Sequence, residues 1–256
     1  MNSSEATFWD HLDILRSCLL RSSALVLVVF VAAFVMKDEL FSIVLAPRTS
    51  DFVSYRWLDI EPFSLRLVNV GLTEQFMAHV KTAFFAALLL ASPYVVTELF
   101  RFVSPALYRR ERRVGVAVVC SAYLMFMLGV LLNYFIVFPL TVRFLGTYQV
   151  SPDVGNLLSL QSYVDTLLSM SLVMGVVFEL PVVCGGMGAL GVLNHRRMAV
   201  FRRHAVVAIL VVAAIITPTT DAFTLFVVAL PIWLLYELSI LIVRLTGHAQ
   251  GTPTSP

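Results

Sequence analysis

Long apolar runs constrain the fold of this chain more than any other feature of its sequence. A helix that crosses a bilayer needs roughly 20 apolar residues, with a range of about 17–25. We therefore predict an all-α polytopic membrane protein, and its first four transmembrane helices fall at about 22–36, 82–100, 114–138 and 163–193.

The apolar stretch from His204 to Val243 is interrupted by the sequence Thr-Pro-Thr-Thr-Asp at 217–221. Because these residues favour a turn, we predict two helices, at about 204–216 and 222–243, joined by a tight hairpin. The first of them is too short to cross a normal bilayer upright. The prediction is thus six spans, the fifth and sixth short, within one membrane domain over 1–245. A disordered cytoplasmic tail is expected over 246–256.

The composition agrees with the bilayer as the main solvent. Hydrophobic residues make up 59% of the chain and charged residues 13%, whereas a soluble domain has about 25% charged residues. The net charge of +2 is too small to indicate a nucleic-acid partner. Cys18, Cys120 and Cys184 show no disulfide or metal-binding spacing and are predicted to be small buried hydrophobes.

The first 21 residues lack the basic segment and cleavage site of a signal peptide. Phe8, Leu12, Leu15 and Leu19 recur at helical spacing among charged residues, which predicts a short amphipathic helix. Such a helix lies along a membrane surface and leads into the first span.

The basic residues predict the orientation. Segments 101–113 and 194–203 hold five and four arginines, and Arg16, Arg21 and Arg244 fall on the same side of a six-span topology. Because basic loops stay on the cytoplasmic side, both termini are predicted to be cytoplasmic. The long segment 37–78 is then an acidic, partly ordered cap on the outer side.

Motifs for catalysis are lacking. There is no H-E-x-x-H, G-x-S-x-G, Walker loop or C-x-x-C, and no predicted span contains a histidine that could serve a serine as base. An intramembrane hydrolase therefore has no visible catalytic pair. We predict that the chain is not an enzyme and holds no metal or cofactor.

Two acidic residues occupy unusual places. Glu111 lies in Tyr-Arg-Arg-Glu-Arg-Arg on a predicted cytoplasmic loop, where it is either a solvated acid balanced by arginines or a contact for a basic ligand. Glu179 lies near the middle of the fourth predicted span, where a carboxylate is costly. Pro181 removes a helix bond to the carbonyl of Val177, which indicates a polar notch. A structural interhelical hydrogen bond is the alternative for Glu179.

Motifs spread over nearly the whole chain resemble the TatC family, the multi-spanning receptor of the twin-arginine protein translocase. The order and spacing of these motifs over six spans carry the resemblance. They are HLDILR near the N-terminus, LAPR at 45–48, LLASPYV at 89–95, SPALYRRERR before the third span, FELP in the fourth, and TPTTDAFT followed by ALPIWLLYEL at the end.

The resemblance implies a function and a set of partners. Members of the family bind signal peptides with paired arginines in the bacterial cytoplasmic (inner) membrane. They pass folded cargo to single-span partners of the TatA and TatB type, with energy from the proton-motive force. The resemblance also implies a concave, glove-shaped bundle, contact with membrane lipids and association with further copies of the chain.

The same resemblance implies roles for particular residues. Glu111, Phe102 and Pro105 match loop positions that contact the signal, and the N-terminal helix with Asp13 and Arg16 matches a second part of that site. The intramembrane and partner-docking positions are matched by Glu179, Pro181, Asp221 and Glu237.

The sequence departs from the family pattern at two positions. Ile14 stands where the family has a glutamate, and Asp13 is one residue earlier, which rotates it by about 100° around a helix. Leu225 replaces a glutamine that is common after the hairpin. The alternative to a translocase receptor is a proton-coupled transporter of small solutes with Glu179 as its relay.

Overall fold

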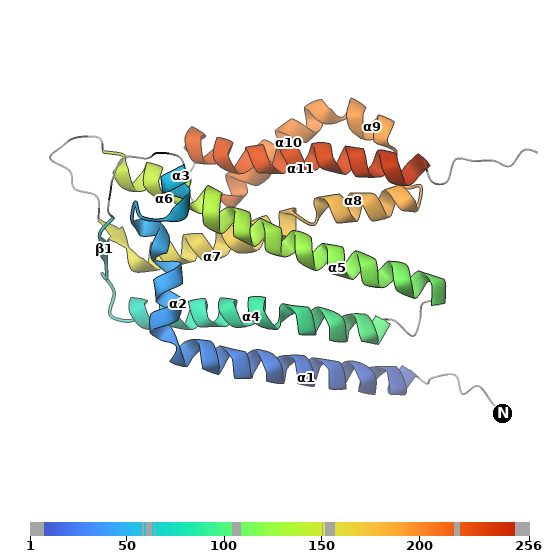
Figure 1. Cartoon of the computed structure of the whole chain (residues 1–256), viewed down its shortest axis with the longest axis horizontal. Coiled ribbons are helices and arrows are strands. Elements are labelled where there is room, and N and C mark those ends of the chain that lie inside the picture. The colour runs from blue at the N-terminus through green and yellow to red at the C-terminus, as the bar shows by residue number, and fades with distance from the viewer. Residues whose placement is uncertain are drawn as a thin grey trace, which may run out of the picture. The chain divides into compact units, whose positions relative to one another are not determined.

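The computed structural model describes residues 8–57, 59, 63, 65–103, 109–149, 151, 157–217 and 221–248. This part of the chain is mostly helical (Figure 1). Its α-helices are α1 (Phe8–Val35), α2 (Lys37–Val44), α3 (Val53–Trp57), α4 (Glu74–Val103), α5 (Arg109–Leu132), α6 (Phe138–Thr147), α7 (Leu160–Val177), α8 (Leu180–Ala189), α9 (His195–Val200), α10 (Arg202–Ile216) and α11 (Ala222–His248). A 3₁₀ turn, η1 (Ala46–Arg48), and a π-helical turn, η3 (Asn133–Val137), complete the helical elements of the described residues.

Five helical stretches of the described chain are long and apolar enough to cross a membrane. Many of their large apolar side chains are exposed, as lipid-facing side chains are. Helix α10 has only 15 residues, about 22 Å at 1.5 Å per residue, against about 30 Å of hydrocarbon. The five stretches are Leu12–Val35, Glu74–Leu99, Gly115–Thr147, Leu160–Ala189 and Ala222–Leu245.

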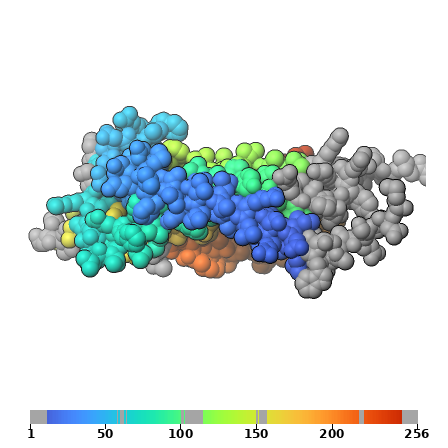
Figure 2. Space-filling model, turned by 90° about the horizontal axis from the view of Figure 1, so that it is seen from below, coloured from blue at the N-terminus to red at the C-terminus, as the bar shows by residue number. Residues whose placement is uncertain are grey.

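The chain divides into two compact units. The first consists of residues 1–44 and 73–123, and the second of residues 45–72 and 124–256. In the first unit α1 and α4 run side by side and in opposite directions (Figure 1). Figure 2 shows the side chains of α1, in blue, as part of the surface along the helix.

Small residues allow α1 and α4 to approach closely. Ala83, Ala87 and Ala91 are spaced four residues apart on α4, and each is at most 1% exposed. On α1, Cys18 and Ser22 are also buried and four residues apart. Since lipid tails are as apolar as leucine, helices associate in membranes by such close packing of small residues.

His79 corrects the prediction that no span contains a histidine. It lies in the Glu74–Leu99 stretch, because this span begins earlier than the predicted start at 82. The imidazole stacks on Phe34 with ring centroids 4.0 Å apart and meets Phe41 edge-on at 5.8 Å. Aromatic packing from α1 and α2 therefore surrounds this side chain.

In the second unit, glycines let the end of α5 pack directly on α7. A Cβ atom at Gly129 would lie 2.5 Å from the carbonyl oxygen of Met174, and one at Gly175 would lie 2.6 Å from the ring of Phe126. At Gly129 the neighbour is backbone and leaves no room for a side chain, whereas at Gly175 the Phe126 ring would have to shift. Beyond this contact, the amide of Asn133 in η3 donates to the hydroxyl of Ser171 on α7 at 2.9 Å.

In the segment between the first two predicted spans, η1 packs on α6 and α3 packs on η3. Tyr55 on α3 is 1% exposed. Its hydroxyl lies 2.9 Å from the carbonyl oxygen of Pro47 and 2.8 Å from that of Pro139. Nearby, the hydroxyl of Ser54 donates to the carbonyl of Phe135 in the π-helical turn. The side-chain hydroxyls of α3 thus act as hydrogen-bond donors to backbone carbonyls at and beside irregular backbone.

A short parallel strand pair departs from the all-α prediction. Strand β1 (Leu67–Val68) pairs with β2 (Leu158–Ser159), with Leu67 opposite Leu158. The hydroxyl of Ser159 then caps α7 by accepting from the amides of Gln161 and Ser162. Two residues per strand are too few for a periodic pattern, so neither strand can be predicted from the sequence.

The fourth predicted span is divided into α7 and α8. Helix α7 ends at Val177, and α8 begins at Leu180 with Pro181 in its first turn. Proline is tolerated in the first turn of a helix because its missing N–H has no partner there in any case. At the other end of the chain, α11 continues to His248, so residues 246–248 of the predicted tail are helical and 249–256 lie outside the described residues.

We predict that Tyr55→Phe lowers the free energy of unfolding by about 1–3 kcal/mol, because it removes the hydroxyl shared by two buried carbonyls. Burial raises the pKa of Tyr55 above its ordinary value of 10.0. The unfolded chain therefore loses this proton first as the pH rises above that value, and stability falls. Thermal unfolding in detergent at neutral and alkaline pH measures both effects.

Tyr94→Phe is the matched control, since Tyr94 is exposed on α4. It should leave the neutral-pH unfolding temperature unchanged. If Tyr55→Phe and Tyr94→Phe unfold at the same temperature, the Tyr55 hydroxyl does not stabilise the packing of α3.

Candidate functional site

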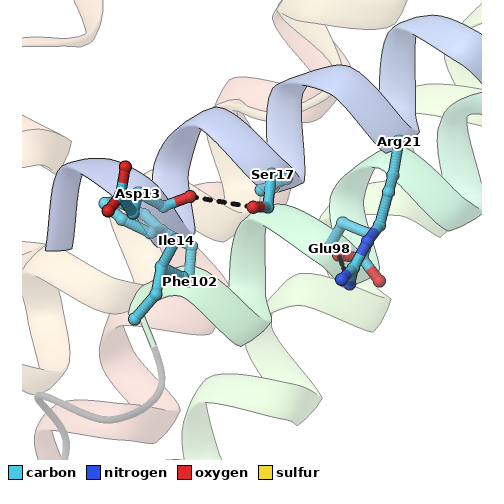
Figure 3. A pocket seen from close by; sticks show the side chains of 7 residues that line it. Asp13, Ile14, Ser17, Arg21, Glu98 and Phe102 are labelled. Atoms are coloured by element: carbon cyan, nitrogen blue, oxygen red, sulfur yellow. Dashed lines mark hydrogen bonds and ion pairs between the residues drawn. The ribbon is translucent and has the colours of Figure 1, made fainter. Parts of the chain in front are cut away.

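A pocket of about 320 Å³ opens between the N-terminal half of α1 and the C-terminal end of α4 (Figure 3). All of its lining residues belong to the first unit. Four of the seven are polar or charged and the others are apolar or weakly polar. They are Asp13, Ile14, Ser17, Cys18 and Arg21 from α1, and Glu98 and Phe102 from α4.

Helical spacing places the lining residues of α1 on one face. Residues three and four apart lie on the same side of a helix, which brings Ile14, Cys18 and Arg21 into line toward α4. Ile14 extends toward Phe102, while the Asp13 carboxylate lies at the end of the pocket far from Glu98 (Figure 3). The hydroxyl of Ser17 donates to the Asp13 carbonyl at 2.9 Å, so it is engaged with its own helix.

Glu98 is the functional candidate that the sequence analysis missed. Its side chain is 7% exposed, and a carboxylate oxygen lies 3.9 Å from the Arg21 guanidinium of α1, whose side chain is 64% exposed. Glu98 is the single acidic residue in the predicted span 82–100. The rule that singled out Glu179, a carboxylate within an apolar run, also applies to Glu98.

Only some of the other predicted signal-binding residues lie in this pocket. Phe102 is half-buried in the pocket wall, and Arg16 is exposed on α1 outside the pocket lining. Glu111 belongs to the first turn of α5, but its side chain lies outside the described part. Pro105 lies outside the described residues altogether. The pocket thus brings together two of these five residues, Asp13 and Phe102.

Glu179 lies at the break between α7 and α8. It occupies the position before α8, and its side chain makes no hydrogen bond that caps this helix. The side chain is half-buried and Pro181 is buried. The break therefore presents a carboxyl group within a stretch that is otherwise apolar.

Asp221 caps the start of α11. Its carboxylate accepts from the amide of Thr224 at 2.7 Å, and its carbonyl accepts from the amide of Leu225 at 3.1 Å. Phe223 stacks on Phe144 of α6 with centroids 4.5 Å apart. These contacts give Asp221 a local structural role at the hairpin.

Glu237 ties α11 to the start of α10. Its carboxylate lies 2.7 Å from the Arg202 guanidinium, a distance typical of a charge-assisted hydrogen bond. The adjacent Tyr236 donates to the carbonyl of Met198 on α9 at 2.8 Å. Met198 packs in turn with Ile240 and Val243 of α11. Glu179, Asp221 and Glu237 therefore belong to three separate local arrangements.

Metal ligands do not gather among the residues that the structure describes. No group of three or more histidine, cysteine, aspartate or glutamate side chains there could hold a metal ion. The chemistry offered by the α1–α4 pocket is carboxylate recognition of a cation, with an aromatic and an aliphatic side chain beside it.

The fold and the pocket define a class: a multi-spanning helical membrane protein with acidic groups at one end of its first long helix pair. The model of the family described as Sec-independent protein translocase protein (TatC) matches residues 10–231. The chain belongs to the TatC family, whose members are components of a protein translocase.

Individual relatives and a solved structure support the same family assignment. The TatC protein of Deinococcus radiodurans is 34% identical, over 94% of this chain and 87% of the relative. That of Desulforapulum autotrophicum is 33% identical, over 97% of this chain and 88% of the relative. A crystal structure titled as the twin-arginine translocase receptor TatC superposes with a TM-score of 0.70 at 32% identity, covering 92% of this chain and 99% of that one.

We predict that Asp221→Ala lowers the free energy of unfolding by about 1 kcal/mol, because it removes the cap on the Thr224 amide. Asp221→Asn should retain nearly all of the stability, since an amide oxygen also accepts at a helix start. Thermal unfolding of the two variants in detergent gives the comparison. Equal unfolding temperatures for Asp221→Ala and the unaltered protein would contradict the capping role.

Proposed function

We propose that this chain is the receptor and core subunit of a twin-arginine translocase. It binds signal peptides with paired arginines on the cytoplasmic side. Together with TatA- and TatB-type single-span proteins and further copies of itself, it exports folded proteins with energy from the proton-motive force. It works without catalytic activity of its own and without a cofactor.

The family match over residues 10–231 is the observation that carries this proposal. The α1–α4 pocket supports it independently, because it joins Asp13 and Glu98 to the apolar walls of Ile14 and Phe102. An arginine side chain presents a delocalised charge with fork-shaped donors, which match carboxylates better than a lysine does. Its methylene stem packs well against apolar side chains.

The proposed topology has six spans in a bacterial inner membrane, with both termini in the cytoplasm. The five long apolar stretches and the 15-residue α10 support this number, because a short helix still crosses where the bilayer is locally thinned. The clusters of arginine before α5 and around α9 support the orientation. The concave, glove-shaped arrangement of the spans stays a prediction.

The proposed roles divide the polar residues into two groups. Signal binding is assigned to Glu111 and Asp13, with Phe102, Pro105 and Arg16 beside them. Docking of single-span partners is assigned to a second set, formed by Glu179, Pro181, Asp221 and Glu237.

We predict that Glu111→Gln abolishes the binding of a twin-arginine signal peptide while the protein stays folded and inserted. The remaining charges around this position are arginines, which repel a basic ligand. Asp13→Asn should cost less, because Asp13 is displaced from the usual acidic position. Site-specific crosslinking of a labelled signal peptide to the purified protein in detergent or nanodiscs measures both variants.

Glu39→Gln is the matched control, because Glu39 is an exposed acid on α2, which packs against the other end of α4 from the pocket. Crosslinking at the unaltered yield in Glu111→Gln would overturn its assignment. A loss in Asp13→Asn equal to that in Glu111→Gln would contradict the lesser role of Asp13. Robust proton-linked solute uptake by the protein alone in liposomes would contradict the translocase function.

We predict that Glu179→Ala impairs partner assembly and transport while the initial binding of the signal remains. The half-buried carboxyl at the α7–α8 break can hydrogen-bond a polar side chain of a single-span helix, and such bonds contribute about 0.6–2 kcal/mol each. Co-purification with a TatB-type partner and signal crosslinking are measured on the same variant. Loss of signal binding with normal assembly would refute this separation of roles, and Glu179→Gln should retain part of the assembly.

A further inference from the structure

Glu98 is a buried acid whose cation comes from the neighbouring helix. Its side chain is 7% exposed, and it extends from α4 into the pocket one turn before Phe102. A buried carboxylate is costly without a cation or hydrogen bonds. Arg21 provides this compensation in the structure (Figure 3).

The distance between Glu98 and Arg21 is long, and the Arg21 side chain approaches Glu98 from the surface. The shortest N–O distance is 3.9 Å, and the Arg21 side chain is 64% exposed. The Arg202–Glu237 pair is much closer, at 2.7 Å. An ion pair formed by a mostly exposed arginine without close hydrogen-bond geometry contributes little to stability. Another guanidinium can therefore replace Arg21 at small cost.

The size of the pocket fits arginine side chains. Its volume of about 320 Å³ is near the lower end of the range of roughly 300–1,000 Å³ for ligand pockets. This space accommodates one or two long side chains better than a folded peptide. Arg21 itself lines the pocket, so a guanidinium is already present beside the Glu98 carboxylate.

The two acids of the pocket are at its two ends. Along α1, Asp13 and Arg21 are eight residues apart, about 12 Å at 1.5 Å per residue, and Arg21 marks the position of Glu98. Consecutive side chains of an extended segment point in opposite directions. Of two adjacent arginines in a bound peptide, one can therefore extend toward Glu98, while the other stays available to the acids assigned to signal binding in the proposed function, Glu111 and Asp13. Ile14, between these ends, offers no charge of its own.

We infer that Glu98 is the inner carboxylate that recognises one arginine of a twin-arginine signal, and that Arg21 occupies it until the signal displaces it. This inference rests on the proposed function and names a residue that decides its specificity. One guanidinium replaces another, so the buried carboxylate keeps a cation at every stage. Lysine is a poor substitute because a compact ammonium lacks the planar fork that matches a carboxylate.

The test measures the affinity of signal peptides with Arg-Arg, Lys-Arg, Arg-Lys and Lys-Lys pairs for the full chain in nanodiscs. The proteins are the unaltered chain, Glu98→Gln, Arg21→Gln and Glu74→Gln. Glu74, in the first turn of the same helix α4, provides the matched control and should behave as the unaltered chain does. Size-exclusion profiles and unfolding temperatures show whether each variant is folded.

The inference predicts that Glu98→Gln weakens binding of the Arg-Arg peptide by about tenfold or more. In this variant, replacing one particular arginine by lysine should cost little further affinity, whereas it costs affinity in the unaltered chain. Arg21→Gln should bind the Arg-Arg peptide more tightly, because the internal competitor is gone.

The outcomes separate this inference from the proposed function. An unaltered chain that binds Arg-Arg and Lys-Lys peptides equally would overturn the proposed function. A preference for Arg-Arg that persists at full strength in Glu98→Gln would overturn the inference alone. Equal losses of affinity in Glu98→Gln and Arg21→Gln would also overturn it, since the pair would then be needed intact. If Glu98→Gln does not fold, unchanged binding by Arg21→Gln overturns the displacement.

Discussion

The close packing of α1 against the small residues of α4 determines the arrangement of the first unit. The alanines of α4 let α1 approach, and this approach leaves Glu98 with little access to water. The charge must then be compensated from α1, and Arg21 does so across the helix pair. The pocket forms at this end, because α1 supplies Ile14 and Asp13 there and α4 supplies Phe102. Packing, charge compensation and the candidate site are thus parts of one arrangement.

In the second unit, neutral side chains of α3 lie beside the irregular backbone around η3. The irregular backbone around η3 has a hydrogen bond to Phe135 from Ser54, and Tyr55 lies beside the carbonyl of Pro139. At the α7–α8 break, Pro181 fits because it occupies a first turn. Irregular backbone at membrane depth is tolerated where protein groups satisfy it. The π-helical turn is therefore supported by a side chain of α3, whereas the α7–α8 break is accommodated by the position of Pro181.

The sequence predicted the features that depend on local composition. The helical membrane class follows from apolar runs that match the thickness of a bilayer, and the short α10 follows from the interruption at 217–221. A polar notch at Pro181 was predicted from the missing backbone donor, whereas the division of the span into α7 and α8 was not predicted. The family resemblance, confirmed by the comparisons, depended on motif order along the chain.

The features that were missed depend on contacts between distant segments. Strand β1 pairs with β2 across about 90 residues of sequence, and Tyr55 reaches Pro139 from a separate loop. Glu98 can be found in the sequence as an acid within an apolar span. Its pairing with Arg21 cannot be predicted there, because only the packing of α1 on α4 brings the two residues together. For Asp13 and Ile14, by contrast, helical spacing alone predicted that the two side chains point in different directions, and the structure places Ile14 toward Phe102 (Figure 3).

Export of a folded reporter protein is the direct test of the translocase function. The chain is expressed with TatA- and TatB-type partners in a bacterium that lacks its own TatC-type receptor. The reporter carries either an Arg-Arg or a Lys-Lys signal. We expect export of the folded reporter with the Arg-Arg signal alone, and loss of export when the proton-motive force is collapsed. Failure to export the Arg-Arg reporter, with the chain inserted and its partners present, would contradict this function.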